Sequence, residues 1–277
     1  KHIEAVNKNG LLLENETGKH VIRIPAKYAH EISEKANLII IFTKTYHTKS
    51  ALESVKHLID DDTFVLTVQN GLGNVEKVSE YVNPSRIIVG MTNHPSEFLA
   101  PGQIRSIGHG KTKIMSADKK MNEMLQSVCD AFNSAGLPCE ISPDVFCNIW
   151  QKVAFNVALN SIGCVTYLSN GGIASVPEGV TLAKRVVEEV VMVANKKGFN
   201  VKLDQVIASV EDALTHHKHH IGSMLQDVLA KRQTEIETLN GAVVKEAKQL
   251  GLSVPFTEAL YYLVRIQEQT YNQRVNQ

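Results

Sequence analysis

The sequence predicts an α/β domain followed by an all-helical domain, and two observations carry this prediction. Residues 1–142 alternate between short apolar runs and segments with helical spacing, whereas residues 143–277 show almost only helical spacing. Within these runs nearly every residue is apolar, with no alternation of apolar and polar positions, which is typical of parallel strands covered on both faces. Alternation of such strands with helices favours a Rossmann-like, doubly wound sheet.

The expected elements of the first half follow from apolar runs and turn residues. NLIIIFT and TFVLTV are continuous apolar runs, and Gly10 is suited to end a helix. In chain order we expect a helix over 1–9, a hairpin over 11–24, a strand over 37–43, a helix over 47–59, a strand over 63–68, a helix over 73–82, a strand over 86–92, two short strands within 101–115 and a helix over about 119–135.

The second half is predicted to be helical throughout. Pro255 suits a first helical turn, and Gly198, Gly241 and Gly251 mark ends or weak points. The expected helices cover 144–162, 176–197, 203–217, 223–249 and 255–273. The apolar helices over 176–197 and 255–273 fit burial against their own domain or against a second copy, so a homodimer stays open.

Composition excludes several classes of function. Lys plus Arg equals Asp plus Glu at 29 each, so there is no electrostatic case for binding nucleic acid or an anionic membrane. No apolar run reaches the roughly 18–20 residues that span a bilayer. The four cysteines form no CxxC pair, which favours reduced thiols in a cytoplasmic protein over a metal site or a disulfide framework.

An amide side chain, Asn70, follows the predicted strand 63–68 in the stretch LTVQNGLGN. Asn-Gly usually marks a tight turn, but helical spacing follows here instead of a second strand. Ligands of doubly wound folds bind at the carboxyl ends of the strands, which is where Asn70 lies. The spacing alone leaves both interpretations open, a turn and a binding residue.

The most specific pattern is a polar stripe in WQKVAFNVALNSIG. Lys152, Asn156 and Asn160 stand at i, i+4 and i+8, on one face of a helix that is apolar at the six positions between them. Each polar group would cost a few kcal/mol in a buried helix without a partner. The stripe therefore predicts a polar cleft that binds a ligand. The alternative is that Lys152 reaches solvent and the asparagines cap neighbouring loops.

The stretch GSMLQDVLAKRQTEIETLNGAVVKEAKQLG has a similar character. Ser223 is expected to be the N-cap of its helix. Glu235 lies in the middle of the same predicted helix, where spacing alone favours a solvated surface carboxylate.

Several of these motifs together resemble the ketopantoate reductase (2-dehydropantoate 2-reductase) family. They are QNGLGN, W-x-K-x-x-x-N-x-x-x-N, S-M-x-x-D, T-E-I-x-x-L-N-G and PGQIRSIGHGKT, and the similarity runs from residue 1 to about 270. The resemblance implies NADPH-dependent reduction of 2-dehydropantoate, a small 2-oxo acid, to pantoate on the route to pantothenate and coenzyme A.

The resemblance also implies roles for individual residues. Lys152 would be the general acid that protonates the carbonyl oxygen. Glu235 would lie by the cofactor and the substrate hydroxyls, and this role replaces the interpretation of Glu235 as a solvated surface carboxylate. Asn70 would stand at the junction of nicotinamide and substrate. The implied substrate-binding residues are Asn156, Asn160, Asn170 and Ser223, and the further implied cofactor contacts are Lys44 and Ser96.

One expected motif of the family is missing. Nicotinamide-binding folds use a Gly-x-Gly-x-x-Gly turn at the pyrophosphate, and none of the 17 glycines forms it. Helix 1–9 resembles the segment that follows the family's second strand, so about 30 residues, the opening of one β-α-β unit, are expected to be absent. The alternatives are a non-catalytic paralogue or fragment that binds a small hydroxy or oxo acid or a protein partner without NADPH, and a reductase of another 2-oxo acid.

A cluster of histidines, His216, His217, His219 and His220, precedes Ser223. A metal site is one interpretation, and an exposed connector is the other. We expect the connector and predict no metal site.

Overall fold

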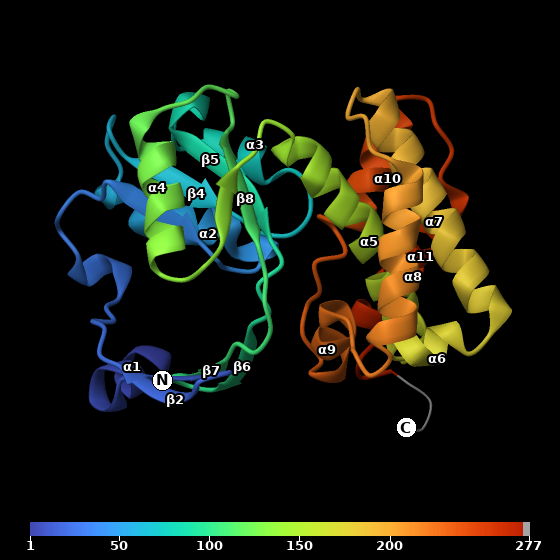
Figure 1. The fold of residues 1–277 in the computed structure, drawn as a ribbon, viewed down its shortest axis with the longest axis horizontal. Coiled ribbons are helices and arrows are strands. Elements are labelled where there is room, and N and C mark those ends of the chain that lie inside the picture. The colour runs from blue at the N-terminus through green and yellow to red at the C-terminus, as the bar shows by residue number, and fades with distance from the viewer. Residues whose placement is uncertain (274–277) are drawn as a thin grey trace. The chain divides into compact units, whose positions relative to one another are not determined.

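The computed structural model describes residues 1–273 and confirms the predicted fold class: a mixed α/β N-terminal part with a parallel sheet, then an all-helical part (Figure 1). The chain forms two compact units. One contains residues 1–43, 47–69 and 75–145, and the other contains 44–46, 70–74 and the chain from Phe146 onward.

The main sheet of the first unit has the strand order β3-β4-β5-β8-β9. Its strands are β3 (Leu38–Ile41), β4 (Phe64–Thr67), β5 (Ile87–Thr92), β8 (Thr112–Ser116) and β9 (Cys139–Ile141). The first three are parallel neighbours, β8 runs antiparallel to β5, and β9 is parallel to β8. Every residue of β4, which lies between β3 and β5, is buried, as its unbroken apolar pattern predicts.

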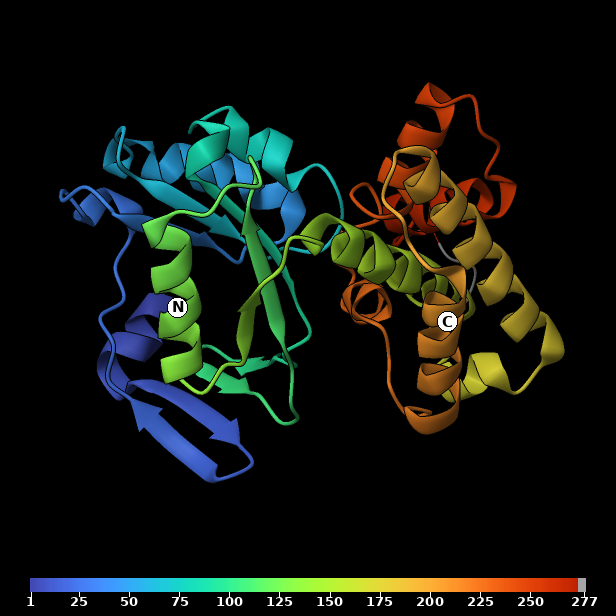
Figure 2. The ribbon, with the colours of Figure 1, turned by 45° about the horizontal axis from the view of Figure 1, so that its top comes forward.

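Helices cover both faces of this sheet, as a doubly wound fold requires. The helices α2 (Thr48–Val55) and α3 (Asn74–Ser79) lie on one face and α4 (Glu123–Ser134) on the other (Figure 2). Leu52 of α2 and Val78 pack with Val65 and Ile87 of the strands in one fully buried cluster.

A second, smaller sheet has the strand order β2-β1-β7-β6. It contains β1 (Leu11–Asn15), β2 (Gly18–Ile22), β6 (Glu97–Ala100) and β7 (Gln103–Arg105), with α1 (His2–Asn9) before it. The predicted hairpin is confirmed as β1–β2. The two strands predicted within 101–115 do not pair: β7 joins the small sheet, whereas the largely buried β8 pairs with β5 in the large one.

The second unit is a helical assembly around one apolar core. Its helices are α5 (Val145–Thr166), α6 (Asn170–Ala174), α7 (Pro177–Lys196), α8 (Leu203–His216), α9 (Ser223–Leu229), α10 (Asn240–Gln249) and α11 (Pro255–Gln269). Val187 and Val190 of α7 and Val243 of α10 are fully buried in this core together with Val157 and Ala158 of α5. No helix within residues 1–273 is long and apolar enough to cross a membrane.

The predicted single helix over 223–249 is wrong. The structure has α9, an irregular segment over 230–239 and then α10. Lys231 has a φ of 51°, which a helix cannot contain, and the backbone N–H of Arg232 donates to the carbonyl oxygen of Asp227. The sequence keeps its helical spacing here, but the helix itself ends after α9, where polar contacts of Asp227 take the place of regular helical hydrogen bonds.

Two short segments after strands belong to the helical unit. Residues 44–46 follow β3 and residues 70–74 follow β4, and both make their contacts with the second unit. These segments bring Lys44, Thr45 and Asn70 to the same unit as Lys152 and Glu235.

Candidate active site

The polar stripe lies on α5, the long buried helix of the second unit. Asn156 and Asn160 are buried, with 9% and 8% of their surface exposed, and Lys152 is partly buried. Because a helix rises about 1.5 Å per residue, Lys152 and Asn160 stand about 12 Å apart along the axis. One face of α5 thus presents an ammonium group and two amides in succession.

The electrostatic environment of Lys152 moves its titration toward neutral pH. Burial lowers the pKa of the Lys152 ammonium from 10.5 to about 8, and the negative charge of Glu235 acts in the opposite direction. At neutral pH the group is therefore still mostly protonated but gives up its proton far more readily than an exposed lysine does.

Glu235 lies in the irregular segment 230–239, and only 8% of its surface is exposed. The prediction of a solvated surface carboxylate, which rests on spacing alone, is therefore wrong. Its Oε1 accepts a hydrogen bond from the backbone N–H of Thr45 at 3.0 Å, and its Oε2 lies 3.7 Å from Lys44 Nζ. The hydroxyls of Thr45 and Thr238 lie 2.8 Å apart beside it. Glu235 is thus fixed by the segment that follows β3.

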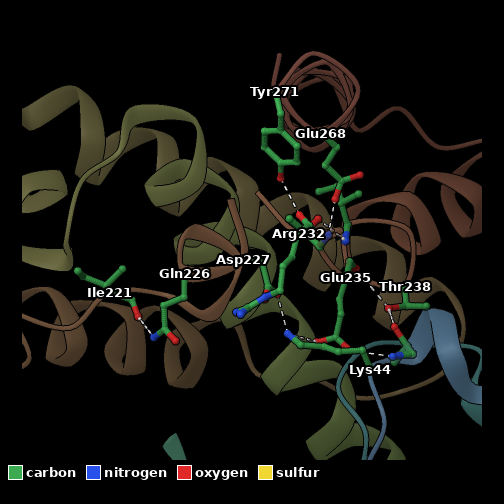
Figure 3. Close-up of polar contacts among 12 residues, drawn as sticks. Lys44, Ile221, Gln226, Asp227, Arg232, Glu235, Thr238, Glu268 and Tyr271 are labelled. Carbon is green, nitrogen blue, oxygen red and sulfur yellow. Dashed lines mark hydrogen bonds and ion pairs between the residues drawn. The ribbon is translucent and has the colours of Figure 1, made fainter. Parts of the chain in front are cut away.

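A buried aspartate, Asp227, completes this charged cluster (Figure 3). It is 2% exposed, and it binds Lys44 Nζ at 2.7 Å and the Arg232 guanidinium at 2.9 and 3.1 Å. Burial alone would lower the pKa of Lys44, but the hydrogen bond to Asp227 and the charge of Glu235 outweigh it, and this pKa is raised. The Lys44 ammonium is held between two carboxylates.

Sequence reasoning missed Asp227 and Arg232. The available signal was the aspartate of S-M-x-x-D, a charged residue among the buried Met224, Leu225 and Val228 of α9. No sequence pattern singles out Arg232, because its hydrogen bonds to Asp227 form only where the chain leaves the helix after Leu229.

The segment that contains Asn70 is bound to the segment of Glu235. Gly71 has a φ of 84°, and the backbone N–H of Leu72 donates to the carbonyl oxygen of Thr238 at 2.8 Å. The side chain of Asn74 donates to the carbonyl oxygen of Asn70 at 3.2 Å. The stretch is therefore a loop docked on residue 238, which lies three residues after Glu235.

A second polar group forms near the far end of the stripe. A Cβ on Gly222 would stand 2.5 Å from Asn160 Oδ1, so the backbone before Ser223 lies directly against Asn160. The backbone N–H of Asn170 donates to the carbonyl oxygen of His220, and its side chain donates to the carbonyl oxygen of Ala213. The residues just before Ser223 therefore lie against both asparagines, Gly222 against Asn160 and His220 against Asn170.

Ser223 does not have the local role that was predicted for it. It is the first residue of α9, and the N-cap position is Gly222. The prediction of an N-cap serine is therefore wrong, because the chain turns into the helix one residue earlier.

Ser96 lies in the first unit, between β5 and β6, and is the only one of the predicted site residues in that unit. The other predicted site residues all belong to the second unit, where two clusters form around Lys152 and around Asn160.

The histidine cluster lies where α8 ends. His216 Nδ1 contacts Asp212 at 2.9 Å, and His217 Nε2 lies 3.7 Å from the same carboxylate. Burial and the neighbouring His217 lower the pKa of His220. Within residues 1–273, no three His, Cys, Asp or Glu side chains are grouped as metal ligands would be.

Comparisons with known proteins find similar sequences over nearly the whole chain. The model of the family "Ketopantoate reductase PanE/ApbA" matches residues 1–119, and that of its C-terminal domain matches 144–268. The 2-dehydropantoate 2-reductase of Pyrococcus horikoshii is 34% identical over 269 residues, covering 97% of this chain and 87% of that protein. The enzyme of the same name from Streptococcus pyogenes is 29% identical, with 98% and 88% covered.

A solved structure shares the fold. The ternary structure of D-mandelate dehydrogenase with NADH and anilino(oxo)acetate superposes with a TM-score of 0.93 at 24% identity, covering 98% of this chain and 89% of that one. Because the two family models match most of the chain and a reductase aligns with nearly all of it at 34% identity, this protein belongs to the ketopantoate reductase family, a family of oxidoreductases.

Proposed function

We propose that the protein is a 2-dehydropantoate 2-reductase that uses NADPH to reduce ketopantoate to pantoate, on the route to pantothenate and coenzyme A. The observation that carries the proposal is the ammonium of Lys152, with a pKa of about 8, on a buried helix beside Glu235. The names of the relatives from Pyrococcus and Streptococcus support the choice of substrate.

The chemistry requires a proton donor at the carbonyl oxygen. A reduced nicotinamide supplies, when bound, the hydride that adds to C2 of the 2-oxo acid. Negative charge then develops on the oxygen, and the Lys152 ammonium stabilises that charge and delivers its proton, so the product is an alcohol and Lys152 becomes a neutral amine. Solvent returns the proton to Lys152, and atoms and charge balance.

The remaining residues have proposed binding roles. Amides offer both donors and acceptors, which suits a substrate with a carboxylate, a ketone and a hydroxyl. We assign substrate binding to Asn156, Asn160, Asn170 and Ser223, the junction of substrate and nicotinamide to Asn70, and cofactor contacts to Lys44, Ser96 and Glu235.

Gly71 and Gly110 do not supply a cradle for the cofactor's pyrophosphate. A Cβ on Gly71 would stand 2.4 Å from the carbonyl oxygen of Thr238, and one on Gly110 would stand 2.4 Å from the backbone of His94. These glycines make room for neighbouring backbone and not for a phosphate. The proposed cofactor contacts therefore come from Lys44, Asn70, Ser96 and Glu235, and not from these two glycines.

The proposal is tested by following nicotinamide oxidation with ketopantoate and with phenylglyoxylate, the 2-oxo acid that corresponds to mandelate. Both NADPH and NADH are offered to the protein with each acid. We expect the highest kcat/KM with ketopantoate and NADPH. A preference for phenylglyoxylate would replace ketopantoate as the proposed substrate, and reduction of neither acid would refute the proposal.

A further inference from the structure

The segment 230–239, which carries Glu235, has no regular secondary structure, and yet residues 234–236, 238 and 239 within it are buried. Thr234 and Ile236, the two neighbours of Glu235, are 1% and 0% exposed. A segment outside the regular helices needs further partners for its backbone and side-chain polar groups to keep one conformation. The partners that hold this segment therefore decide where the Glu235 carboxylate stands.

Several of these partners come from one face of α11 and from Tyr271, two residues beyond its end. The hydroxyl of Tyr261 donates to Glu237 Oε2 at 2.9 Å, and Arg265 forms an ion pair with the same carboxylate. Glu268 Oε1 accepts the backbone N–H of Thr234 at 2.5 Å. We call Tyr261, Arg265, Glu268 and Tyr271 the α11 clamp.

The fourth member of the clamp, Tyr271, binds the backbone. Its hydroxyl donates to the carbonyl oxygen of Arg232 at 2.7 Å (Figure 3). Burial, with the charge of Glu268, raises the pKa of Tyr271 to about 12, so the hydroxyl remains a donor throughout the physiological range. The contacts run antiparallel: Tyr261 and Arg265 meet Glu237, Glu268 meets Thr234, and Tyr271 meets Arg232.

The α11 clamp binds residues that precede and follow Glu235 in the chain, and these contacts do not include the Glu235 carboxylate. The side chain of Glu235 instead meets Thr45 and Lys44, and its charge acts on Lys152. The end of α11 is also joined to α5, because the side chain of Gln267 donates to the carbonyl oxygen of Cys164. One helix end thus holds the segment of Glu235 and contacts the helix of Lys152.

We propose that Glu268 and Tyr271 are positioning residues, which fix the segment 230–239 so that Glu235 stands where it acts on Lys152. This inference rests on the proposed function for its consequence in catalysis, but the placement of Glu235 is a property of the folded chain. The charged groups around Glu235 are Lys44 after β3, Asp227 of α9 and Lys152 of α5.

The test compares Glu268→Ala and Tyr271→Phe with two further variants. Glu268→Gln keeps an oxygen that accepts from Thr234 and is the conservative variant. Tyr262→Phe is the matched control, because Tyr262 lies on the same helix, is 49% exposed, and its hydroxyl donates to Glu258 of that helix. The pH dependence of Lys152 labelling by an amine reagent, read by mass spectrometry, gives the pKa of Lys152 without any substrate.

We expect the labelling pKa of Lys152 to fall in Glu268→Ala and Tyr271→Phe, because a displaced Glu235 no longer raises it. In the same two variants kcat/KM should fall roughly 3- to 10-fold, as loss of one hydrogen bond implies. Glu268→Gln and Tyr262→Phe should resemble the wild type in both measurements.

An unchanged Lys152 pKa in folded Glu268→Ala and Tyr271→Phe would overturn the inference. If Glu268→Ala does not fold, Tyr271→Phe, which removes a single oxygen atom, decides in the same way. If the wild type reduces no 2-oxo acid while the pKa still falls in these variants, the proposed function fails and the positioning of Glu235 stands.

Discussion

Replacement of Lys152 by methionine is expected to lower kcat for ketopantoate reduction by about 10²- to 10⁴-fold, the usual contribution of a positioned proton donor. Methionine has nearly the same length and fills the same space on α5, but it carries neither charge nor proton. The loss should appear in kcat more than in KM, because the developing negative charge exists only in the transition state.

The same substitution should stabilise the fold. The fall of the Lys152 pKa from 10.5 to about 8 means that the folded state disfavours the ammonium, by about 1 to 3 kcal/mol for a partly buried group. Below pH 8 both the folded and the unfolded state bind this proton, and the full penalty applies. Between pH 8 and 10.5 the unfolded state binds more protons, so stability rises with pH and the penalty disappears.

Calorimetric melting of Lys152→Met and wild type at neutral pH and near pH 10.5 measures this difference. The Tm advantage of the variant should be largest at neutral pH and should vanish at the higher pH. Lys202→Met is the control, since Lys202 is an exposed lysine whose side chain donates to Asn200.

A Lys152→Met variant that keeps more than about a tenth of the wild-type kcat would exclude Lys152 as the proton donor.

Gly71→Ala should cost about 3 to 5 kcal/mol of folding stability and most of the activity. At a φ of 84° any L-residue loses roughly 1–2 kcal/mol, and here the new methyl would also stand 2.4 Å from the carbonyl oxygen of Thr238. The loop of Asn70 would have to move away from the segment that carries Glu235.

Gly73→Ala is the matched control for this prediction. Gly73 has a φ of 83°, but a Cβ there would meet nothing within 4 Å, so only the backbone strain remains. Chemical denaturation should therefore give a clearly larger loss for Gly71→Ala than for Gly73→Ala. Equal losses in the two variants would show that the contact of residue 71 with Thr238 does not hold the loop.

The sequence was most informative where burial and polarity conflict. Lys152, Asn156 and Asn160 stand out because polar residues are rare in a helix that is otherwise apolar, and the structure places all three on the buried α5. The strands β4 and β5 of the main sheet were also predictable, because a strand covered on both faces needs a continuous apolar run, whereas the short β9 was not predicted.

The remaining features depend on contacts between segments far apart in the chain. Helical spacing continues through residues 230–239, so only the partners Asp227, Glu268 and Tyr271 explain why the helix stops there. Lys44 lies 183 residues before Asp227, and no local pattern indicates that pairing. Local periodicity reports which face of an element is buried, but not which distant side chain meets it.

The central claim is that Lys152 donates the proton and that Glu235 raises its pKa. It is tested most directly by the pH dependence of kcat/KM for ketopantoate reduction, in the wild type and in Glu235→Gln. The rate should fall above a pH of about 8 in the wild type as Lys152 loses its proton, and this limb should move to lower pH in Glu235→Gln. A limb that is absent near pH 8, or that stays in place without the charge of Glu235, would contradict the account.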